Sequence, residues 1–237
     1  MSTTIVSSTF ERGPATPPRL APERSESSAA DRGAYEVAKQ VVDWTGAVAG
    51  LIVLAPLMAL IALAIRWESP GPAVFRQWRI GRGGREFRFL KFRTMVADAE
   101  QKLDGLEPAN EAGCRVLFKI RRDPRVTRLG RFLRRSSLDE LPQLINVLRG
   151  EMSLVGPRPL QRRDNERLAL IEPEGHARRL TVLPGLSGPW QIGARSETDG
   201  LGMLRYDLDY IRDRSLRRDL LIIAQTLTAV VRGRGAY

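Results

Sequence analysis

The chain has 237 residues but is poor in the side chains that most often bind transition metals or act as paired nucleophile and base. Cys114 is its only cysteine, and His176 is its only histidine. One cysteine cannot form an intrachain disulfide, which fits a reducing compartment, and a His/Cys zinc cluster is excluded. A histidine-dependent catalytic triad is disfavoured for the same reason. We interpret His176 as a solvated loop residue.

Acidic side chains are also scarce, with 27 Asp and Glu against 38 Lys and Arg, which gives a net charge of +11. Residues 1–43 hold five basic and six acidic side chains, so 33 basic and 21 acidic ones remain in the rest of the chain. Arginines outnumber lysines by 34 to four, and a guanidinium can bind phosphate through two parallel hydrogen bonds. Such a basic surface attracts nucleic acid, anionic lipid or a phosphorylated substrate.

Aromatic residues make up only 6% of the chain, and the sequence has neither a helix-turn-helix nor a zinc-finger pattern. Both features argue against a basic, membrane-anchored protein that binds nucleic acid. We therefore expect no nucleic-acid partner. The composition leaves a homo-oligomer open.

Residues 1–34 contain few large apolar side chains and are rich in Ser, Pro, Ala and Arg. Such a segment buries too little surface to offset the entropy lost on ordering, so we predict a disordered tail. A cleavable signal peptide is not expected, because no apolar core follows Met1.

A long apolar run follows the tail. Trp44 to Ile65 contains 22 residues without a charge, which is long enough for a membrane helix. Trp44 and Trp67 lie at the two ends of the run, where interfacial aromatic residues are expected. A buried helix of a soluble protein is the alternative. We assign residues 35–67 to a membrane-inserted helix, with membrane lipids as partners.

Pro56 lies near the middle of this run, where it removes a helix hydrogen bond and favours a kink. Hydropathy alone leaves open whether the helix crosses the bilayer or bends and returns to the same face. The portion after the run carries most of the positive charge. The positive-inside rule therefore places residues 68–237 on the cytoplasmic face of the membrane.

Residues 68–237 mix strand and helix patterns, which predicts an α/β body. Residues 74–80 and 86–93 alternate aromatic and basic side chains around a turn at Gly81–Gly84, as in a β-hairpin. The GRGG turn lacks the third glycine and the following long helix of a dinucleotide site. Helices are predicted at 96–106, 142–149 and 216–231. The last is amphipathic, and its apolar face suits either the core or the membrane interface.

The stretch RRSSLDELPQL, residues 134–144, places Asp139 and Glu140 side by side. Ser137 and Glu140 have the spacing of a capping box, in which two side chains satisfy the backbone donors at a helix start. A reacting carboxylate at a positive helix end is the other interpretation. Pro142 would be the fifth residue of a helix capped by Ser137, where it would cost a backbone hydrogen bond. This position favours a distorted helix start that presents Asp139.

Four segments together resemble one protein family, the bacterial sugar transferases. These are KFRTM at 91–95, the run from DPRVTRLGRF to SLVGPRP at 123–159, PGLSGPWQ at 184–191, and the terminal segment that begins DLDYIRDRSLRRDLL. The resemblance covers residues 37–237. The family consists of monotopic phosphoglycosyl transferases, which start the assembly of exopolysaccharides and related glycans, and the chain resembles its short exopolysaccharide starters in size.

The resemblance implies the transfer of a sugar-1-phosphate from a UDP-sugar to undecaprenyl phosphate, with release of UMP and with Mg²⁺ as cofactor. It also implies a re-entrant helix, amphipathic interfacial helices and a cytoplasmic catalytic body at the bacterial inner membrane. The break in that helix is typically Ser-Pro, and here it is Ala55-Pro56. The block around PGLSGPWQ departs from the family at Pro189 and Ala194.

Carried onto this chain, the family's mechanism makes Asp139 the nucleophile that attacks the β-phosphorus of the UDP-sugar. Glu140 is expected to act as a metal ligand or as a base that orients the acceptor, and Asp139 shares the metal. Arg134 and Arg158 match positions that bind phosphate or uridine.

Lys91 and Arg93 of the KFRTM segment are interpreted either as contacts to the lipid phosphate or as structural residues. An inactive scaffold that recruits other glycan enzymes is a rival function. The intact Asp-Glu pair, the KFRTM segment and the PRP segment argue against it.

Overall fold

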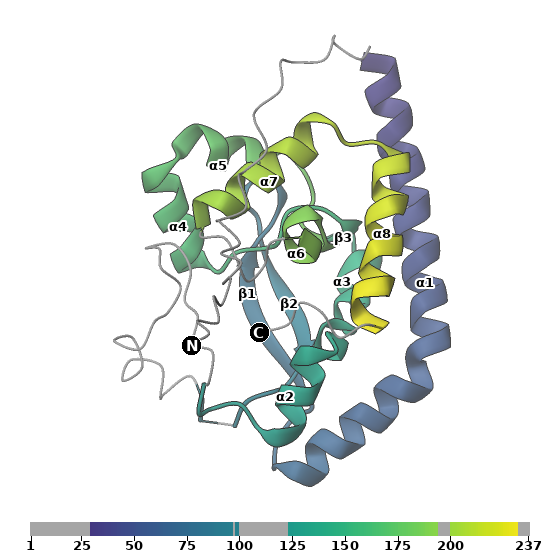
Figure 1. Ribbon diagram of the computed structural model, residues 1–237, viewed down its shortest axis with the longest axis vertical. Helices are drawn as coiled ribbons and strands as arrows, with labels where there is room; N and C mark the ends of the chain where they lie inside the picture. Colours follow the sequence, from purple (N-terminus) through teal and green to yellow (C-terminus); the bar gives the residue numbers. More distant parts are fainter. Residues whose placement is uncertain (1–28, 97, 100–122, 194–199, 232–237) are drawn as a thin grey trace, which may run out of the picture.

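The computed structural model describes residues 29–96, 98–99, 123–193 and 200–231 (Figure 1). Residues 1–28 of the predicted tail lie outside this range, as does most of the predicted helix at 96–106. The elements in the described part are, in chain order, α1 (Ala29–Glu68), β1 (Val74–Ile80), η1 (Arg82–Gly84), β2 (Glu86–Phe92), α2 (Arg128–Arg135), η3 (Leu138–Glu140), α3 (Gln143–Leu148), β3 (Ser153–Val155), α4 (Arg162–Ile171), α5 (Pro173–Arg179), β4 (Gly185–Ser187), α6 (Pro189–Gly193), α7 (Gly200–Arg212) and α8 (Leu216–Val231).

Helix α1 is longer than the predicted membrane segment, since it begins at Ala29 rather than at residue 35 and ends at Glu68. Just after the added turns, α1 is bound to the body: the hydroxyl of Tyr35 donates to Asp219 Oδ2 over 2.9 Å, and Lys39 Nζ donates to the same oxygen over 3.0 Å. Figure 1 shows that α1 changes direction along its length. Pro56 is inside the helix and cannot donate a backbone hydrogen bond there.

One side of α1 packs against the rest of the protein, and the other is an exposed apolar surface. The helix has a mean hydropathy of 2.8 over its most apolar window, and only 11% of that window is buried. The core helix of a soluble protein would be mostly buried, so this surface needs another apolar environment. The large exposed residues include Val41, Ile52, Val53, Leu60 and Leu63. One long apolar N-terminal helix on a mixed α/β body fits a monotopic membrane protein.

Strands β1 and β2 form an antiparallel hairpin whose register pairs Val74 with Phe92 and Ile80 with Glu86. The predicted strands are confirmed, except that β2 ends one residue earlier than expected. The turn holds Gly83 and Gly84 at positive φ, which only glycine adopts without strain. One end of the hairpin therefore reaches the body near α5, where Gly83 N donates to Leu180 O over 2.8 Å.

The hairpin and the short helices α2 and α3 pack against α1. One cluster joins Ala47 of α1 to Phe87 and Phe89 of β2 and to Leu144 and Val147 of α3. A second cluster joins α1 to β2 and α2 near the other end of α1; it contains Ile61, Ile65, Phe92 and Leu133. Body side chains thus contact α1 on both sides of its proline.

Helices α4 and α5 lie on the side of the body away from α1, and α7 runs from them toward α8 (Figure 1). Leu168, Met203 and Leu204 are buried between them, together with Trp190 of α6. His176 lies in α5, not in a loop, and its Nε2 lies 3.0 Å from Asn165 Oδ1. The loop interpretation was wrong because a helix begins at Pro173, and proline is well tolerated in the first turn of a helix.

Helix α8 has the predicted bounds and runs beside α1 (Figure 1). Ile222 is buried against Val155 and Tyr210, so one side of α8 packs on the core. Leu220, Leu221 and Leu227 are more than half exposed. Core packing and an exposed apolar face therefore occur on the same helix, and the two interpretations of this segment are compatible.

Candidate active site

The segment that presents Asp139 begins with a reversal of the chain after α2. Ser137 has φ 55° and ψ 16°, and it is the one non-glycine residue with positive φ in the described part of the chain. Such a conformation costs about 1 kcal/mol or more for a residue with a side chain. A single 3₁₀ turn, Leu138–Glu140, follows and leads through Pro142 into α3. The strained residue lies two positions before Asp139.

No capping box is present in this segment. The Ser137 side chain makes no capping hydrogen bond; its backbone carbonyl instead accepts from Glu140 N over 3.2 Å. The Glu140 carboxylate is turned toward Arg158, whose Nη2 lies 2.9 Å from Oε1. The expectation of a distorted helix start is confirmed. Pro142 keeps α3 separate from the 3₁₀ turn that carries the two acidic residues.

Asp139 is buried, with 8% of its surface exposed, and its charge acts on Lys91 and Arg134. Burial lowers the pKa of Arg134, and the Asp139 charge opposes this shift. Burial also lowers the pKa of Lys91 to about 8; the neighbouring Arg134 charge adds to the shift, and Asp139 opposes it. One buried carboxylate thus interacts electrostatically with two cations.

Arg134 is held in place by the KFRTM segment. Its Nε donates to Thr94 Oγ1 over 3.0 Å, and Thr94 O accepts from Thr127 N over 3.1 Å. Helix α2 approaches this segment closely, because a Cβ placed on Gly130 would lie 2.1 Å from Thr94 O. The glycine is therefore needed to bring the arginine of α2 beside Asp139.

Arg158 is positioned through the backbone of its own segment. Arg79 Nη1 donates to Pro159 O over 3.0 Å, and Arg179 Nη2 donates to Arg158 O. Arg179 Nε is in turn paired with the fully buried Asp207 over 2.7 Å. Burial raises the pKa of Asp207, and the Arg179 charge counteracts this. The PRP segment is thus clamped from β1 on one side and from α5 and α7 on the other.

Arg79 belongs to the cluster but was not singled out from the sequence. Its guanidinium lies over the ring of Phe89 at 5.1 Å, and Nη2 donates to Gln77 Oε1 over 2.8 Å. Burial lowers its pKa well below the ordinary value, and the Arg158 charge adds to the shift. Its Nε is buried without a hydrogen-bond partner in the described part of the chain. The register of the hairpin could have found it, since β1 residue 79 and β2 residue 91 project from the same face.

The structure separates the two cations of KFRTM. Lys91 faces the cluster, with its Nζ 5.3 Å from the centre of the Phe75 ring. Arg93 lies beyond the end of β2 and donates from Nη1 to Pro70 O over 2.8 Å and from Nη2 to Ser69 O over 2.7 Å. These contacts tie the hairpin to the end of α1. Of the two alternatives for Arg93, they favour the structural one.

Mg²⁺ can be tested against the donors that are present. Within the described residues, no group of three or more His, Cys, Asp or Glu side chains could hold a metal by itself. Mg²⁺ commonly binds one or two carboxylates and takes its other ligands from water and substrate phosphates. The adjacent acids Asp139 and Glu140 fit that type of site, provided that a diphosphate supplies further oxygens.

The comparisons with known proteins concern the sequence of the chain. Residues 34–233 match the family of bacterial sugar transferases. The chain belongs to this family. It is 44% identical over 211 residues to a UDP-glucose:undecaprenyl-phosphate glucose-1-phosphate transferase of Caulobacter vibrioides. The aligned region covers 87% of this chain and 74% of that protein.

Two further relatives differ in length. The exopolysaccharide production protein ExoY of Rhizobium meliloti is 37% identical, over 90% of this chain and 93% of its own. The galactosyl transferase CpsE of Streptococcus agalactiae is 43% identical over 84% of this chain. The match spans only 43% of CpsE. This chain therefore spans less than half the length of CpsE but nearly the whole length of ExoY.

Proposed function

We propose that this chain transfers a sugar-1-phosphate from a UDP-sugar to undecaprenyl phosphate and releases UMP. The observation that carries the proposal is the buried carboxylate of Asp139 beside the cations Lys91 and Arg134. A buried carboxylate among cations can react as a nucleophile toward a phosphorus atom whose oxygens the same cations bind. Relatives at 37–44% identity include proteins named for this reaction or for exopolysaccharide production.

The reaction has two displacement steps. In the first, a carboxylate oxygen of Asp139 attacks the β-phosphorus of the UDP-sugar; a bond from this oxygen to phosphorus forms, and the bond from phosphorus to the UMP oxygen breaks. UMP leaves with that electron pair. In the second, a phosphate oxygen of undecaprenyl phosphate attacks the same phosphorus and releases the Asp139 carboxylate. The product is an undecaprenyl diphosphate sugar.

The side chains around Asp139 have different proposed roles in binding the substrates. Lys91 and Arg134 interact electrostatically with Asp139, and we expect them to bind the phosphate that reacts. Arg158 is paired with Glu140, its segment is held by Arg79, and we expect it to bind the second phosphate or the uridine. Arg79 adds a further cation close to Arg158, and such a basic cluster would attract an anionic diphosphate. Bound at Asp139 and Glu140, Mg²⁺ would neutralise charge that develops on the leaving phosphate.

The contacts of α1 support a re-entrant placement in the inner membrane. Near its start, Lys39 is paired with Asp219, and at its end Glu68 Oε1 accepts from Leu129 N over 3.0 Å. Both ends of the helix are therefore bound to the same body. A helix that crossed the bilayer would carry its far end, and the body residues bound to it, to the opposite face. A bend near Pro56 lets both ends stay on the cytoplasmic face, with the catalytic body at the headgroup level.

The decisive experiment uses purified full-length protein in detergent with Mg²⁺ and a UDP-sugar as the only substrate. We expect intact-protein mass spectrometry to detect an added sugar phosphate on the wild type, and UMP to be released in equal amount. Asp139→Asn should show neither, because an amide is a poor nucleophile. Asp213→Asn removes a carboxylate that lies on the surface beside Arg212, and it should behave as the wild type.

Direct transfer gives a different result. In that mechanism, no adduct forms, and UMP appears only when undecaprenyl phosphate is also present. Absence of UMP release under both conditions, with Asp139→Asn and wild type alike, would instead support an inactive scaffold.

A further inference from the structure

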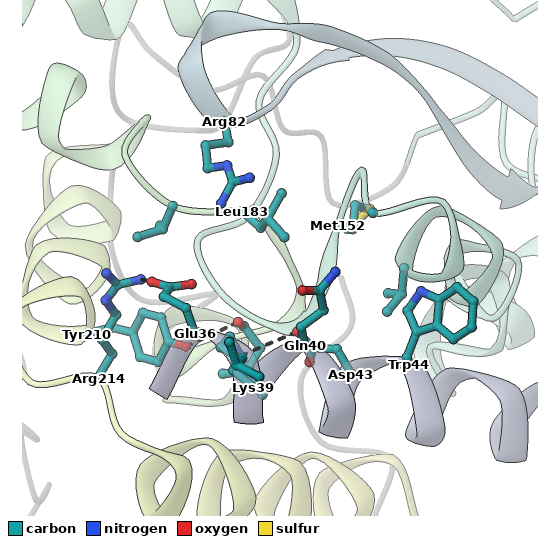
Figure 2. Close-up of a pocket in the computed structure, with 15 residues that line it drawn as sticks. Glu36, Lys39, Gln40, Asp43, Trp44, Arg82, Met152, Leu183, Tyr210 and Arg214 are labelled. Carbon is teal, nitrogen blue, oxygen red and sulfur yellow. Dashed lines mark hydrogen bonds and ion pairs between the residues drawn. The ribbon is translucent and has the colours of Figure 1, made fainter. Parts of the chain in front are cut away.

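A pocket of about 270 Å³ lies between the first turns of α1 and the body (Figure 2). None of the residues proposed to act on the substrates lines it. In Figure 2, the α1 residues Glu36, Lys39, Gln40, Asp43 and Trp44 form one wall, and Tyr210 and Arg214 close one end. Arg82 reaches toward the pocket from the hairpin turn.

The α1 wall is a fixed part of the structure. Asp219 of α8 is buried and accepts hydrogen bonds from Tyr35, Lys39 and Tyr210 at 2.9, 3.0 and 2.7 Å. Asp43 is also buried, and its Oδ1 accepts from Leu154 N over 3.0 Å. The charges at the base of the pocket are therefore satisfied within the protein. A ligand there would have to be recognised by the rim.

The rim continues into a second pocket of about 460 Å³ under the hairpin turn. The two pockets share Arg82, Gly150 and Leu183, so they form one groove, which we call the turn groove. The second pocket adds Arg85 and Arg149 to its lining. The guanidinium groups of Arg82, Arg85 and Arg149 are exposed, and none has an acidic partner within the described residues.

The acidic residues of the turn groove are already engaged. Glu36 is paired with Arg214 over 2.5 Å, and Glu86 is paired with Arg162 over 2.5 Å. Glu151 Oε2 accepts from Asn146 Nδ2 over 2.6 Å. The groove therefore presents three arginines without an acidic partner in the described chain, and such a set is complementary to a phosphate group.

Trp44 fixes the depth of the turn groove relative to the proposed membrane. It is the first residue of the charge-free run, and 54% of its surface is exposed. Its indole Nε1 donates to Leu148 O over 3.1 Å, and Leu148 immediately precedes Arg149. Tryptophan prefers the level of the lipid headgroups. Arg149 is thus at the height at which phospholipid phosphates lie.

From this arrangement we infer that the turn groove binds the headgroup phosphate of an anionic phospholipid. Arg82, Arg85 and Arg149 contact the headgroup, and Trp44 lies beside the first carbons of the acyl chains. This inference rests on the membrane insertion of α1 in the proposed function. Such a contact would fix the body against the membrane at a point separate from Asp139.

The test measures lipid preference at Trp44 by fluorescence quenching of the full-length protein. The protein is reconstituted in phosphatidylcholine vesicles in which a fraction of the lipid is brominated phosphatidylglycerol or brominated phosphatidylcholine. The part of the quenching that is lost in the Trp44→Phe variant is assigned to Trp44. Each surface arginine near a bilayer changes the affinity for anionic lipid by roughly five-fold. We expect the wild type to prefer phosphatidylglycerol several-fold, and Arg82→Gln/Arg149→Gln to lose that preference.

The matched control is Arg178→Gln/Arg205→Gln, which removes the same charge from exposed positions on α5 and α7. This variant should keep the preference. Equal quenching by both lipids in the wild type, or an unchanged preference in Arg82→Gln/Arg149→Gln, would overturn the inference. Loss of the preference when inorganic phosphate replaces chloride at constant ionic strength would also overturn it and indicate a site for free phosphate.

The outcome also separates this inference from the proposed function. If α1 were not inserted, neither brominated lipid would quench the tryptophans. If only the turn groove were misassigned, brominated phosphatidylcholine would still quench them, and UMP release in detergent would be the same in the wild type and in Arg82→Gln/Arg149→Gln.

Discussion

Replacing Lys91 with arginine should extend the activity of this chain to higher pH. Burial lowers the pKa of Lys91 from 10.5 to about 8; the neighbouring Arg134 charge adds to the shift, and Asp139 opposes it. The protonated fraction of a group with this pKa falls about ten-fold between pH ~7 and pH ~9. A guanidinium keeps its proton over the same range. The lysine therefore loses its charge where an arginine does not.

The assay is the pH dependence of kcat/KM for UMP release from pH ~6.5 to pH ~9.5. The wild type should lose about ten-fold between pH ~7 and pH ~9, because the uncharged lysine no longer binds the reacting phosphate. Lys91→Arg should have lower activity at neutral pH but no such fall. Lys91→Met should be weak throughout and should also lack the inflection near pH 8.

The same shift predicts the opposite trend for stability. Between the folded pKa of about 8 and the unfolded value of 10.5, the unfolded chain holds more protons on Lys91 than the folded chain does. The free energy of unfolding therefore rises with pH in this window, by roughly 3 kcal/mol at most. Lys91→Met should lack this rise. A wild-type rate that stays flat to pH ~9.5, or an inflection that persists in Lys91→Arg, would refute the assignment of this lysine.

Three further predictions concern residues that hold the site together. Gly130→Ala should lower the free energy of unfolding by about 2 kcal/mol and reduce UMP release, because the new Cβ would lie 2.1 Å from Thr94 O. Asp219→Asn should destabilise the fold by about 3 kcal/mol in thermal unfolding, because α1 loses the charged acceptor of two of its side chains. Arg79→Gln should reduce kcat/KM for the UDP-sugar roughly 30-fold, through the loss of a charged hydrogen bond in the site.

Each of these has a control in the same chain. Gly33→Ala lies on α1 with nothing within 4 Å of the new Cβ, and it should not destabilise the protein. Asp213→Asn should leave thermal unfolding unchanged. Arg76→Gln removes an exposed arginine from the same strand as Arg79 and should keep normal kinetics. Unfolding or kinetics that match between a variant and its control would contradict the role given to that residue.

Much of the secondary structure could be predicted because its signals are local. The hairpin follows from alternation and a glycine turn, and β1 and α8 have the predicted bounds. Asp139 and Glu140 were also singled out from the sequence, through a motif and the position of Pro142. The hairpin register could have placed Arg79 on the same face as Lys91, but its contact with Pro159 forms only when the hairpin packs against a segment distant in the chain.

Sequence by itself determined the apolar run, the excess of arginine and the family to which the chain belongs, since composition and motifs do not depend on packing. Tertiary structure alone decided which basic side chains lie close to Asp139. Lys91 and Arg93 are two residues apart, yet the end of β2 sends one to Asp139 and the other to Ser69 and Pro70. The left-handed Ser137 and the contacts of α1 with the body likewise depend on residues distant in the chain. Pattern cannot encode such contacts, because they form only when the separate elements pack together.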